Sequence, residues 1–353
     1  MTIIEELRAR SFPFRMLQSK LRDEQMHSGV GWGPLLEWYD TNMPDHDETV
    51  TWKDVFTEIY TNHLKYGTKG VVVFTIDRLT ALALIKKIRS INYADSAFNV
   101  NYPLSLTTDE LEVASFNPVP TFFEVEDSNV YRLVMCAKRA IKNRELFDFE
   151  TLDPSVRSAF DSSGQDIQID EIIVVSKRLI QSFDSVIINP DENRLEIHID
   201  ISNKISTDDL FRAIKVNVSK INELLESIPT IERLKDPINF FPYIKALYEE
   251  PDGYIHQLGH ATGTASIKDE KMRGKGKDLR TELFHEEGLK AIGGFSDFYS
   301  ITKGWDGDSL GSPQLTIAGR YAQAGSPEAS ITYAIIDGCN CKEDFEMVLS
   351  KLI

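Results

Sequence analysis

The chain has 353 residues, of which 42% are hydrophobic and 27% are charged, so it has the composition of a globular protein long enough for two or three domains. Acidic residues outnumber basic ones by 55 to 39, and the formal net charge of −16 excludes a general attraction to nucleic acid. Three cysteines are too few for a secreted disulfide framework, and no apolar run approaches the length of a membrane span. We therefore expect a soluble, cytoplasmic protein without a membrane partner.

The first 150 residues are predicted to form a mixed α/β region. Residues 70–76 (GVVVFTI) are an apolar run typical of a buried strand, and Asp77 can cap the helix that follows. A further strand is expected over residues 122–140. The segment KRAIKNR at 138–144 is then expected to be helical, where it would place several basic residues on one face.

The polar stretch 151–166 contains a proline and a glycine, so we expect it to link the N-terminal region to a middle region, residues 167–250. In the middle region the turn-like sequence NPDEN at 189–193 separates two strand-like runs, which predicts a β-hairpin. A capped amphipathic helix is expected to follow from Thr207 to about Ser227 and to pack on this hairpin.

Glycine marks a change of structure near residue 253, because 14 of the 20 glycines lie from that position onward. Glycine suits turns and bulges better than helix interiors, so residues 251–353 are expected to form a glycine-rich antiparallel β domain with a terminal helix. Residues 254–267 and 279–287 are predicted to be two arms of a hairpin in this domain. The expected fold class is α+β, with helix-rich mixed N-terminal and middle regions preceding the β domain.

The most unusual feature lies between those two predicted arms, where residues 271–280 (KMRGKGKDLR) hold five basic residues and one acidic residue. Lysine and arginine donate to phosphate oxygens, and the two glycines allow close backbone approach to a ligand. We expect this basic segment to form the hairpin tip and to bind anions, with a histidine on one arm as its neighbour. The predicted anion-binding residues are Lys271, Arg273, Lys275, Lys277, Arg280 and His285. A solvated tip whose charge prevents edge pairing is the structural alternative.

Two patterns offer metal ligands without predicting a bound metal. Glu196, His198 and Asp200 alternate with aliphatic residues, so they share one face of a strand and could ligate a divalent ion. A half-buried strand with one wet face explains the same alternation. His256 and His260 could share an ion on a helix, but on a strand they would lie about 13 Å apart.

No complete catalytic set is visible in the sequence, so we expect a binding protein rather than an enzyme, and no cofactor. The leading hypothesis is a sensor or accessory subunit that engages nucleic acid, a nucleotide or an acidic protein partner through the basic segment. One alternative is a metal-dependent phosphodiesterase or nuclease-like hydrolase that uses Glu196, His198 and Asp200. The other is a structural subunit of a multi-protein complex.

Overall fold

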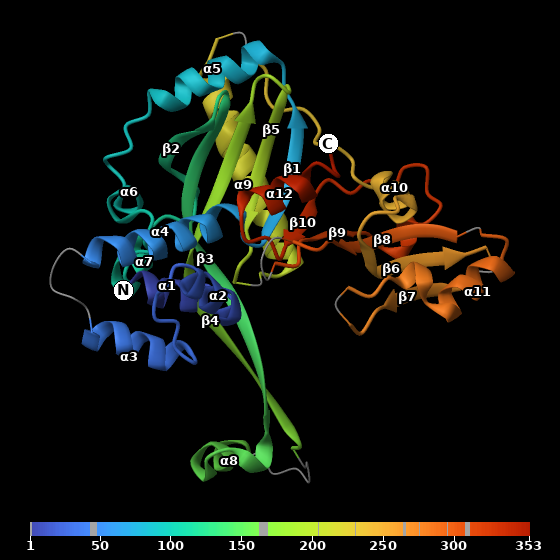
Figure 1. Cartoon of the computed structure of the whole chain (residues 1–353), viewed down its shortest axis with the longest axis horizontal. Coiled ribbons are helices and arrows are strands. Elements are labelled where there is room, and N and C mark those ends of the chain that lie inside the picture. The colour runs from blue at the N-terminus through green and yellow to red at the C-terminus, as the bar shows by residue number, and fades with distance from the viewer. Residues whose placement is uncertain are drawn as a thin grey trace.

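The computed structural model describes residues 2–42, 48–161, 169–203, 205–229, 231–263, 266–274, 276–294, 296–307 and 311–353. Within these residues ten strands form one sheet in the order β2-β3-β4-β5-β1-β10-β9-β8-β6-β7 (Figure 1). The neighbouring strands are paired antiparallel throughout this order. Together with the helices around the sheet, this architecture confirms the predicted α+β fold class.

The strands differ in length, and β3 and β4 are the longest with 19 residues each. The strand bounds are β1 Lys69–Thr75, β2 Val119–Asp127, β3 Val130–Asp148, β4 Glu171–Asn189, β5 Arg194–Asp200, β6 Tyr254–Thr262, β7 Ile267–Lys271, β8 Ser296–Gly304, β9 Gln314–Ala318 and β10 Ala334–Asp337. The helix bounds are α1 Ile3–Ala9, α2 Phe14–Asp23, α3 Trp32–Asn42, α4 Glu48–Tyr66, α5 Arg78–Arg89, α6 Ala97–Asn101, α7 Thr108–Val113, α8 Pro154–Asp161, α9 Thr207–Glu226, α10 Tyr243–Glu249, α11 Leu283–Ala291 and α12 Lys342–Leu349. Short 3-10 helices are η1 Phe149–Thr151, η2 Leu279–Thr281 and η3 Tyr321–Gln323.

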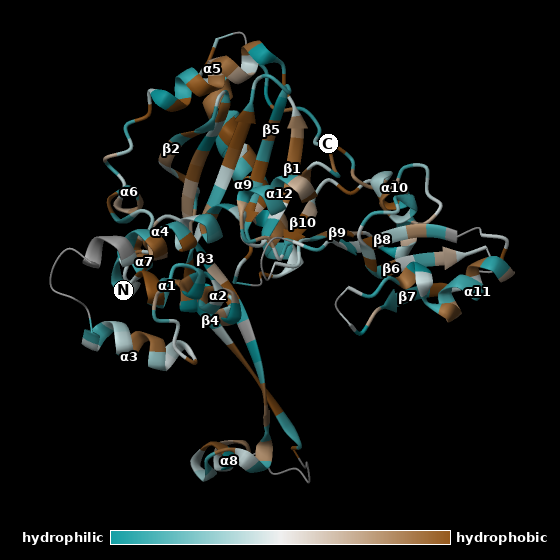
Figure 2. Ribbon diagram, in the orientation of Figure 1, coloured by the Kyte–Doolittle hydropathy of each residue, from teal (hydrophilic) through white to brown (hydrophobic). Residues whose placement is uncertain are grey.

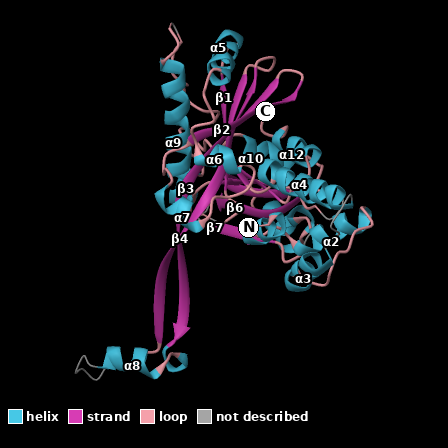
Figure 3. Cartoon of the chain, turned by 90° about the vertical axis from the view of Figure 1, so that its left-hand side faces the viewer, coloured by secondary structure: helices cyan, strands magenta, loops and turns pink. Residues whose placement is uncertain are grey.

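Two hydrophobic clusters pack against the sheet, and the larger one contains residues from both of its faces. Leu133 lies in the cluster beneath α5 and α9, whose members extend along the chain from Tyr66 to Leu352. Val134 and Phe183 point to the opposite face, where residues of α1, α2 and α4 cover them. Figure 3 shows α5 and α9 on one side of the sheet and α4 and α12 on the other. The sheet is therefore the common core of the chain.

Several predicted elements are confirmed, and β1 and α9 have nearly the expected bounds. β1 is the predicted buried strand, and the Asp77 carboxylate caps α5 by accepting from the backbone N–H of Thr80 at 2.9 Å. β4 and β5 form the predicted hairpin, in which Asn189 pairs with Arg194. α9 matches the predicted amphipathic helix and packs against β5. These elements share strong local signals, namely apolar periodicity and a turn or cap at the end.

The segment 138–144, predicted to be helical, is instead part of β3. It pairs with β4 along its whole length, from Lys138 opposite Gln181 to Arg144 opposite Val175. Its charge pattern suits either structure, so the strand partner, which is distant in sequence, decides the conformation.

The far halves of β3 and β4 project from the body as a two-stranded ribbon, which we call the arm, residues 139–180 (Figures 1 and 3). Among the described residues, β3 beyond Cys136 and β4 before Ser185 pair with no strand other than each other. Of the expected linker, the described residues 151–161 lie at the end of this arm and contain α8. That stretch therefore connects two strands of one hairpin.

The prediction that residues 279–287 form the second strand of the C-terminal hairpin is wrong. β6 pairs with β7, and residues 279–287 form η2 and the first turns of α11. α11 begins at a side-chain cap, because the Glu282 carboxylate accepts from the backbone N–H of His285 at 2.7 Å. The basic segment is therefore not a hairpin tip and instead leads from β7 into α11.

The predicted terminal helix is confirmed as α12, whose Phe345 and Val348 are buried against the sheet. Across the described ranges, no helix combines the length and the apolar character that crossing a bilayer requires.

Candidate functional site

The basic segment, residues 271–280, presents a group of unpaired cations. Lys271, Arg273 and Lys277 are exposed, and none of them forms an ion pair with another described residue. Lys275 lies outside the described residues. Because no carboxylate neutralises these three side chains, their donors are available to an external anion.

Arg280 is held differently from the other cations of the segment. Its guanidinium donates to the carbonyl oxygens of Glu250 at 2.5 Å and Gly253 at 2.7 Å, and to the Asp278 carboxylate at 2.9 Å. Asp278 also accepts from the backbone N–H of Ile255 at 3.1 Å. These contacts engage all three guanidinium nitrogens, so Arg280 fastens the end of the basic segment to the start of β6.

His285 is buried, away from the surface formed by the three exposed cations. Its Nδ1 lies 2.5 Å from Glu270 Oε2, and its Nε2 lies 2.8 Å from the hydroxyl of Tyr248. On the other side of the same carboxylate, His260 Nε2 lies 3.1 Å from Glu270 Oε1. The structure therefore places His285 in a buried cluster with Glu270 and His260.

This cluster is a set of metal-ligating groups. His260, Glu270 and His285 each bring one ligand atom to within 4.8 Å of the others. Burial alone would raise the pKa of Glu270, but hydrogen bonds from the two imidazoles hold it below its ordinary value. An ionised carboxylate flanked by two imidazoles is a donor set that suits zinc and similar ions. His256, the other histidine of β6, does not belong to the cluster.

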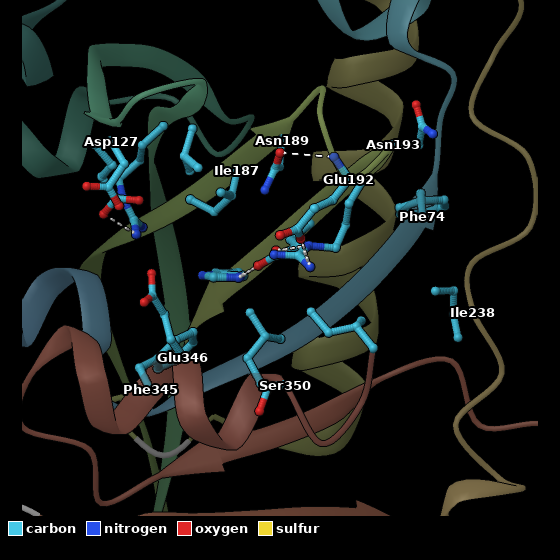
Figure 4. A pocket seen from close by; sticks show the side chains of 18 of the residues that line it. Phe74, Asp127, Ile187, Asn189, Glu192, Asn193, Ile238, Phe345, Glu346 and Ser350 are labelled. Atoms are coloured by element: carbon cyan, nitrogen blue, oxygen red, sulfur yellow. Dashed lines mark hydrogen bonds and ion pairs between the residues drawn. The ribbon is translucent and has the colours of Figure 1, made fainter.

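A second polar region lines a cleft of about 920 Å³ between the sheet and α12. Figure 4 shows Phe345 and Glu346 of α12 across this space from Ile187 and Asn189 of β4. The wall formed by β5 carries polar side chains, as the alternation along that strand predicts.

Those polar side chains are linked to one another by hydrogen bonds. Arg194 donates from Nε to Glu196 Oε1 at 2.7 Å, and His198 Nε2 lies 2.6 Å from Glu196 Oε2. Burial holds the pKa of His198 below its ordinary value despite the neighbouring carboxylate. A neutral ring that donates from Nε2 leaves Nδ1 as an acceptor, and Nδ1 has no hydrogen-bond partner among the described residues.

Asp200, the third residue of the predicted metal-ligating face, is held by other partners. It pairs with Arg10, and its Oδ1 lies 3.6 Å from Lys69 Nζ, both of which are buried. Glu196 and His198 bind each other, whereas Asp200 is neutralised by cations. The three residues share a face of β5 as predicted, but their side chains do not converge on one ion.

Sequence reasoning did not single out Glu270 or Tyr248. Glu270 lies in the charged run Asp-Glu-Lys of β7, where nothing in the sequence distinguishes the residue that points inward. The nearest signal was the spacing of His256 and His260, of which only His260 contributes. The remaining members come together only when α11 folds over the β6–β7 hairpin.

No protein-family model matches the chain, and a search of curated proteins finds no match either.

Proposed function

We propose that the protein binds a polyanion, the phosphate backbone of a nucleic acid, through its basic segment. The observation that supports this function is that Lys271, Arg273 and Lys277 are exposed on one short segment and have no carboxylate partner within the described ranges. Cations of this kind bind phosphates largely by releasing condensed counterions, a contribution that does not depend on nucleotide sequence. Binding is therefore expected to be sequence-tolerant.

Two cations of other elements, α11 and β8, are paired with carboxylates. Lys290 of α11 pairs with Glu286 at 2.7 Å, and Lys303 of β8 pairs with Asp252 at 2.8 Å. Carboxylates therefore neutralise these two lysines, whereas the three cations of the basic segment have no such partner among the described residues. Since the chain as a whole carries −16, the ligand is expected to touch the protein locally instead of wrapping around it.

A polymer is favoured over a free nucleotide by the exposure of the three side chains. Sites for small molecules usually enclose most of their ligand in a concave pocket. Lys271, Arg273 and Lys277 lie on a strand end and a loop and remain in contact with solvent. Such an arrangement suits a backbone that passes across the surface.

The test is a charge reversal with a matched control. The variant Lys271→Glu/Arg273→Glu/Lys277→Glu is compared with Arg15→Glu/Lys86→Glu/Lys215→Glu, which changes the same residue types at exposed positions elsewhere. Fluorescence anisotropy measures the binding of labelled single-stranded and double-stranded oligonucleotides. We expect the first variant to lose about tenfold or more in affinity, and the control to keep most of its affinity, because only the first removes phosphate contacts.

Two outcomes contradict this function. One is that the two triple variants bind equally well, which means that the basic segment makes no contact with the ligand. The other is that the wild-type chain binds neither oligonucleotide.

A further inference from the structure

We propose that His260, Glu270 and His285 bind a zinc ion that joins the two ends of the basic segment. Glu270 lies on β7 immediately before the segment, and His285 lies in the first turn of α11, shortly after it. His260 comes from β6, where it pairs with Lys268 of β7. This site does not depend on nucleic-acid binding, since none of its members belongs to the exposed cations.

The separations between the ligand atoms are close to those of a zinc site. Zinc bonds of about 2.0–2.2 Å in tetrahedral geometry place ligand atoms about 3.3 Å apart. His260 Nε2 and Glu270 Oε1 are 3.1 Å apart, and His285 Nδ1 and Glu270 Oε2 are 2.5 Å apart. One atom of each of the three residues lies within 4.8 Å of the others, so relative side-chain shifts of about 1–1.5 Å would bring all three to zinc-bonding separations.

Tyr248 does not bind the ion itself but orients His285, one of its ligands. Its hydroxyl lies 2.8 Å from His285 Nε2, the nitrogen that faces away from Glu270. A tyrosine hydroxyl both donates and accepts, so it can bond to Nε2 whichever tautomer the ring adopts. When Nδ1 binds the ion, Nε2–H donates to this hydroxyl, the arrangement by which histidine ligands are commonly oriented.

The three residues leave the fourth tetrahedral position of the ion to a water molecule, and the site is otherwise largely closed. The side chains of His260 and His285 are 3% and 1% exposed, whereas that of Glu270 is 18% exposed and marks the side from which an ion can enter. A bound ion would close the stretch between Glu270 and His285 into a loop. It would thereby restrict the freedom of the basic segment and stabilise the packing of α11 on the β6–β7 hairpin.

The test uses the full chain, stripped with a chelator and then titrated with zinc. We expect one zinc per chain by elemental analysis, a rise in Tm on loading, and a visible absorption band of tetrahedral cobalt when Co²⁺ is used instead. Glu270→Gln and His285→Gln should abolish stoichiometric binding. Tyr248→Phe is expected to weaken binding by about tenfold, because it removes only the orienting hydrogen bond.

The matched control is His256→Gln, which changes a histidine on the same strand outside the cluster. It should bind zinc as tightly as the wild-type chain. The site is refuted if the wild-type chain, folded by circular dichroism, takes up no stoichiometric zinc, or if Glu270→Gln and His256→Gln bind zinc equally.

A second inference concerns the arm and stands on different observations. We infer that two copies of the chain associate through their arms, placed antiparallel around a two-fold axis. Four cross-strand pairs follow one another along one face of the arm, from the body toward its end. They are Lys142 with Lys177, Arg144 with Val175, Leu146 with Ile173, and Asp148 with Glu171. All eight residues are exposed.

This order of charges and apolar groups is complementary to itself when reversed. In an antiparallel copy the lysine pair faces the acidic pair at both ends, and Leu146 and Ile173 face Val175 and the aliphatic stem of Arg144. Leu146 and Ile173 are 60% and 61% exposed in the single chain, so both side chains are available for burial against a second copy. Figure 2 shows hydrophobic and hydrophilic residues interspersed along this ribbon.

The area of the contact face on the arm determines how tightly two copies are expected to associate. Seven residues of a two-stranded ribbon cover about 20 Å by about 10 Å, or roughly 200 Å², against about 800 Å² per partner in a standard interface. Val156 and Phe160 of α8 are also exposed and could enlarge the contact. We therefore expect a weak, transient dimer that forms at high protein concentration.

A charge-swap experiment tests the arrangement. Sedimentation velocity over a concentration series should show a monomer–dimer equilibrium for the wild-type chain. Lys142→Glu/Lys177→Glu and Asp148→Lys/Glu171→Lys should each be monomeric, because each variant carries like charges at both ends of the face. An equimolar mixture of the two variants should restore the dimer, since opposite charges then meet at both ends. A wild-type chain that stays monomeric, or a mixture that does not associate, overturns the inference.

Discussion

At Asp200 a buried carboxylate lies between two buried cations from distant parts of the chain. Arg10 follows α1 and Lys69 begins β1, so the ion pairs join the N-terminal helices to the centre of the sheet. Asp200 also accepts from the backbone N–H of Phe183 at 3.2 Å and from the hydroxyl of Ser202 at 2.8 Å. A carboxylate with this many donors has a structural role in the fold.

Removing that carboxylate should destabilise the protein strongly. Asp200→Asn leaves Arg10 and Lys69 buried without a counter-charge, and such losses cost about 3–5 kcal/mol in the free energy of unfolding. Asp191→Asn, which breaks an exposed pair with Arg78, should cost about 1 kcal/mol or less. Urea denaturation of both variants measures the difference. Equal effects would show that Asp200 is not the central counter-ion.

The ion pairs of Asp200 also lead us to expect that the stability of the protein falls at low pH. Burial by itself would raise the pKa of Asp200, but Arg10 and Lys69 hold it far below its usual range. The folded-state pKa is thus below that of the unfolded chain, about 4, so the stabilisation is complete above that pH and is lost as the pH falls further. The stability gap between the wild-type chain and Asp200→Asn should narrow below about pH 4. A constant gap down to pH 2 would contradict this linkage.

Among the elements, those with strong local signals could be predicted from the sequence and those decided by a distant partner could not. The cap at Asp77 and the turn at 189–193 fix α5 and the β4–β5 hairpin with their immediate neighbours. In contrast, residues 138–144 have no local preference that distinguishes helix from strand, and pairing with β4 makes them a strand. Residues 279–287 were assigned to a strand because the surrounding glycines suggested β structure, whereas the Glu282 cap begins a helix there.

Arg280 stabilises the fold of the basic segment, whereas the exposed cations of the segment are the proposed ligand-binding residues. Arg280→Gln should lower the free energy of unfolding by about 1–3 kcal/mol, because two carbonyl oxygens and Asp278 lose a charged donor. The folded variant should keep most of its affinity for an oligonucleotide, since the exposed cations remain. Thermal unfolding and fluorescence anisotropy on the same sample check both statements. A loss of affinity as large as that of the triple charge reversal would show instead that Arg280 contacts the ligand.

At the scale of the whole molecule, one continuous sheet joins the regions on either side of residue 253, which differ in glycine content. β1 pairs with β10, so Gly70 lies opposite Ile335, a partner that no local pattern identifies. The candidate site illustrates the same limit. Its exposed cations are evident from the sequence, whereas the convergence of His260, Glu270 and His285 depends on how three elements pack. Dimers formed through the arms would carry two basic segments, and a long polyanion that reached both would bind with increased avidity.

The salt dependence of oligonucleotide binding tests the role of the basic segment most directly. If Lys271, Arg273 and Lys277 each neutralise one phosphate, the logarithm of the binding constant should fall against the logarithm of salt concentration with a slope of about −2 for a single strand and about −3 for a duplex. The triple charge-reversal variant should bind about tenfold or more weakly, with a slope closer to zero. A wild-type slope near zero, or an unchanged slope in that variant, would contradict binding through this segment.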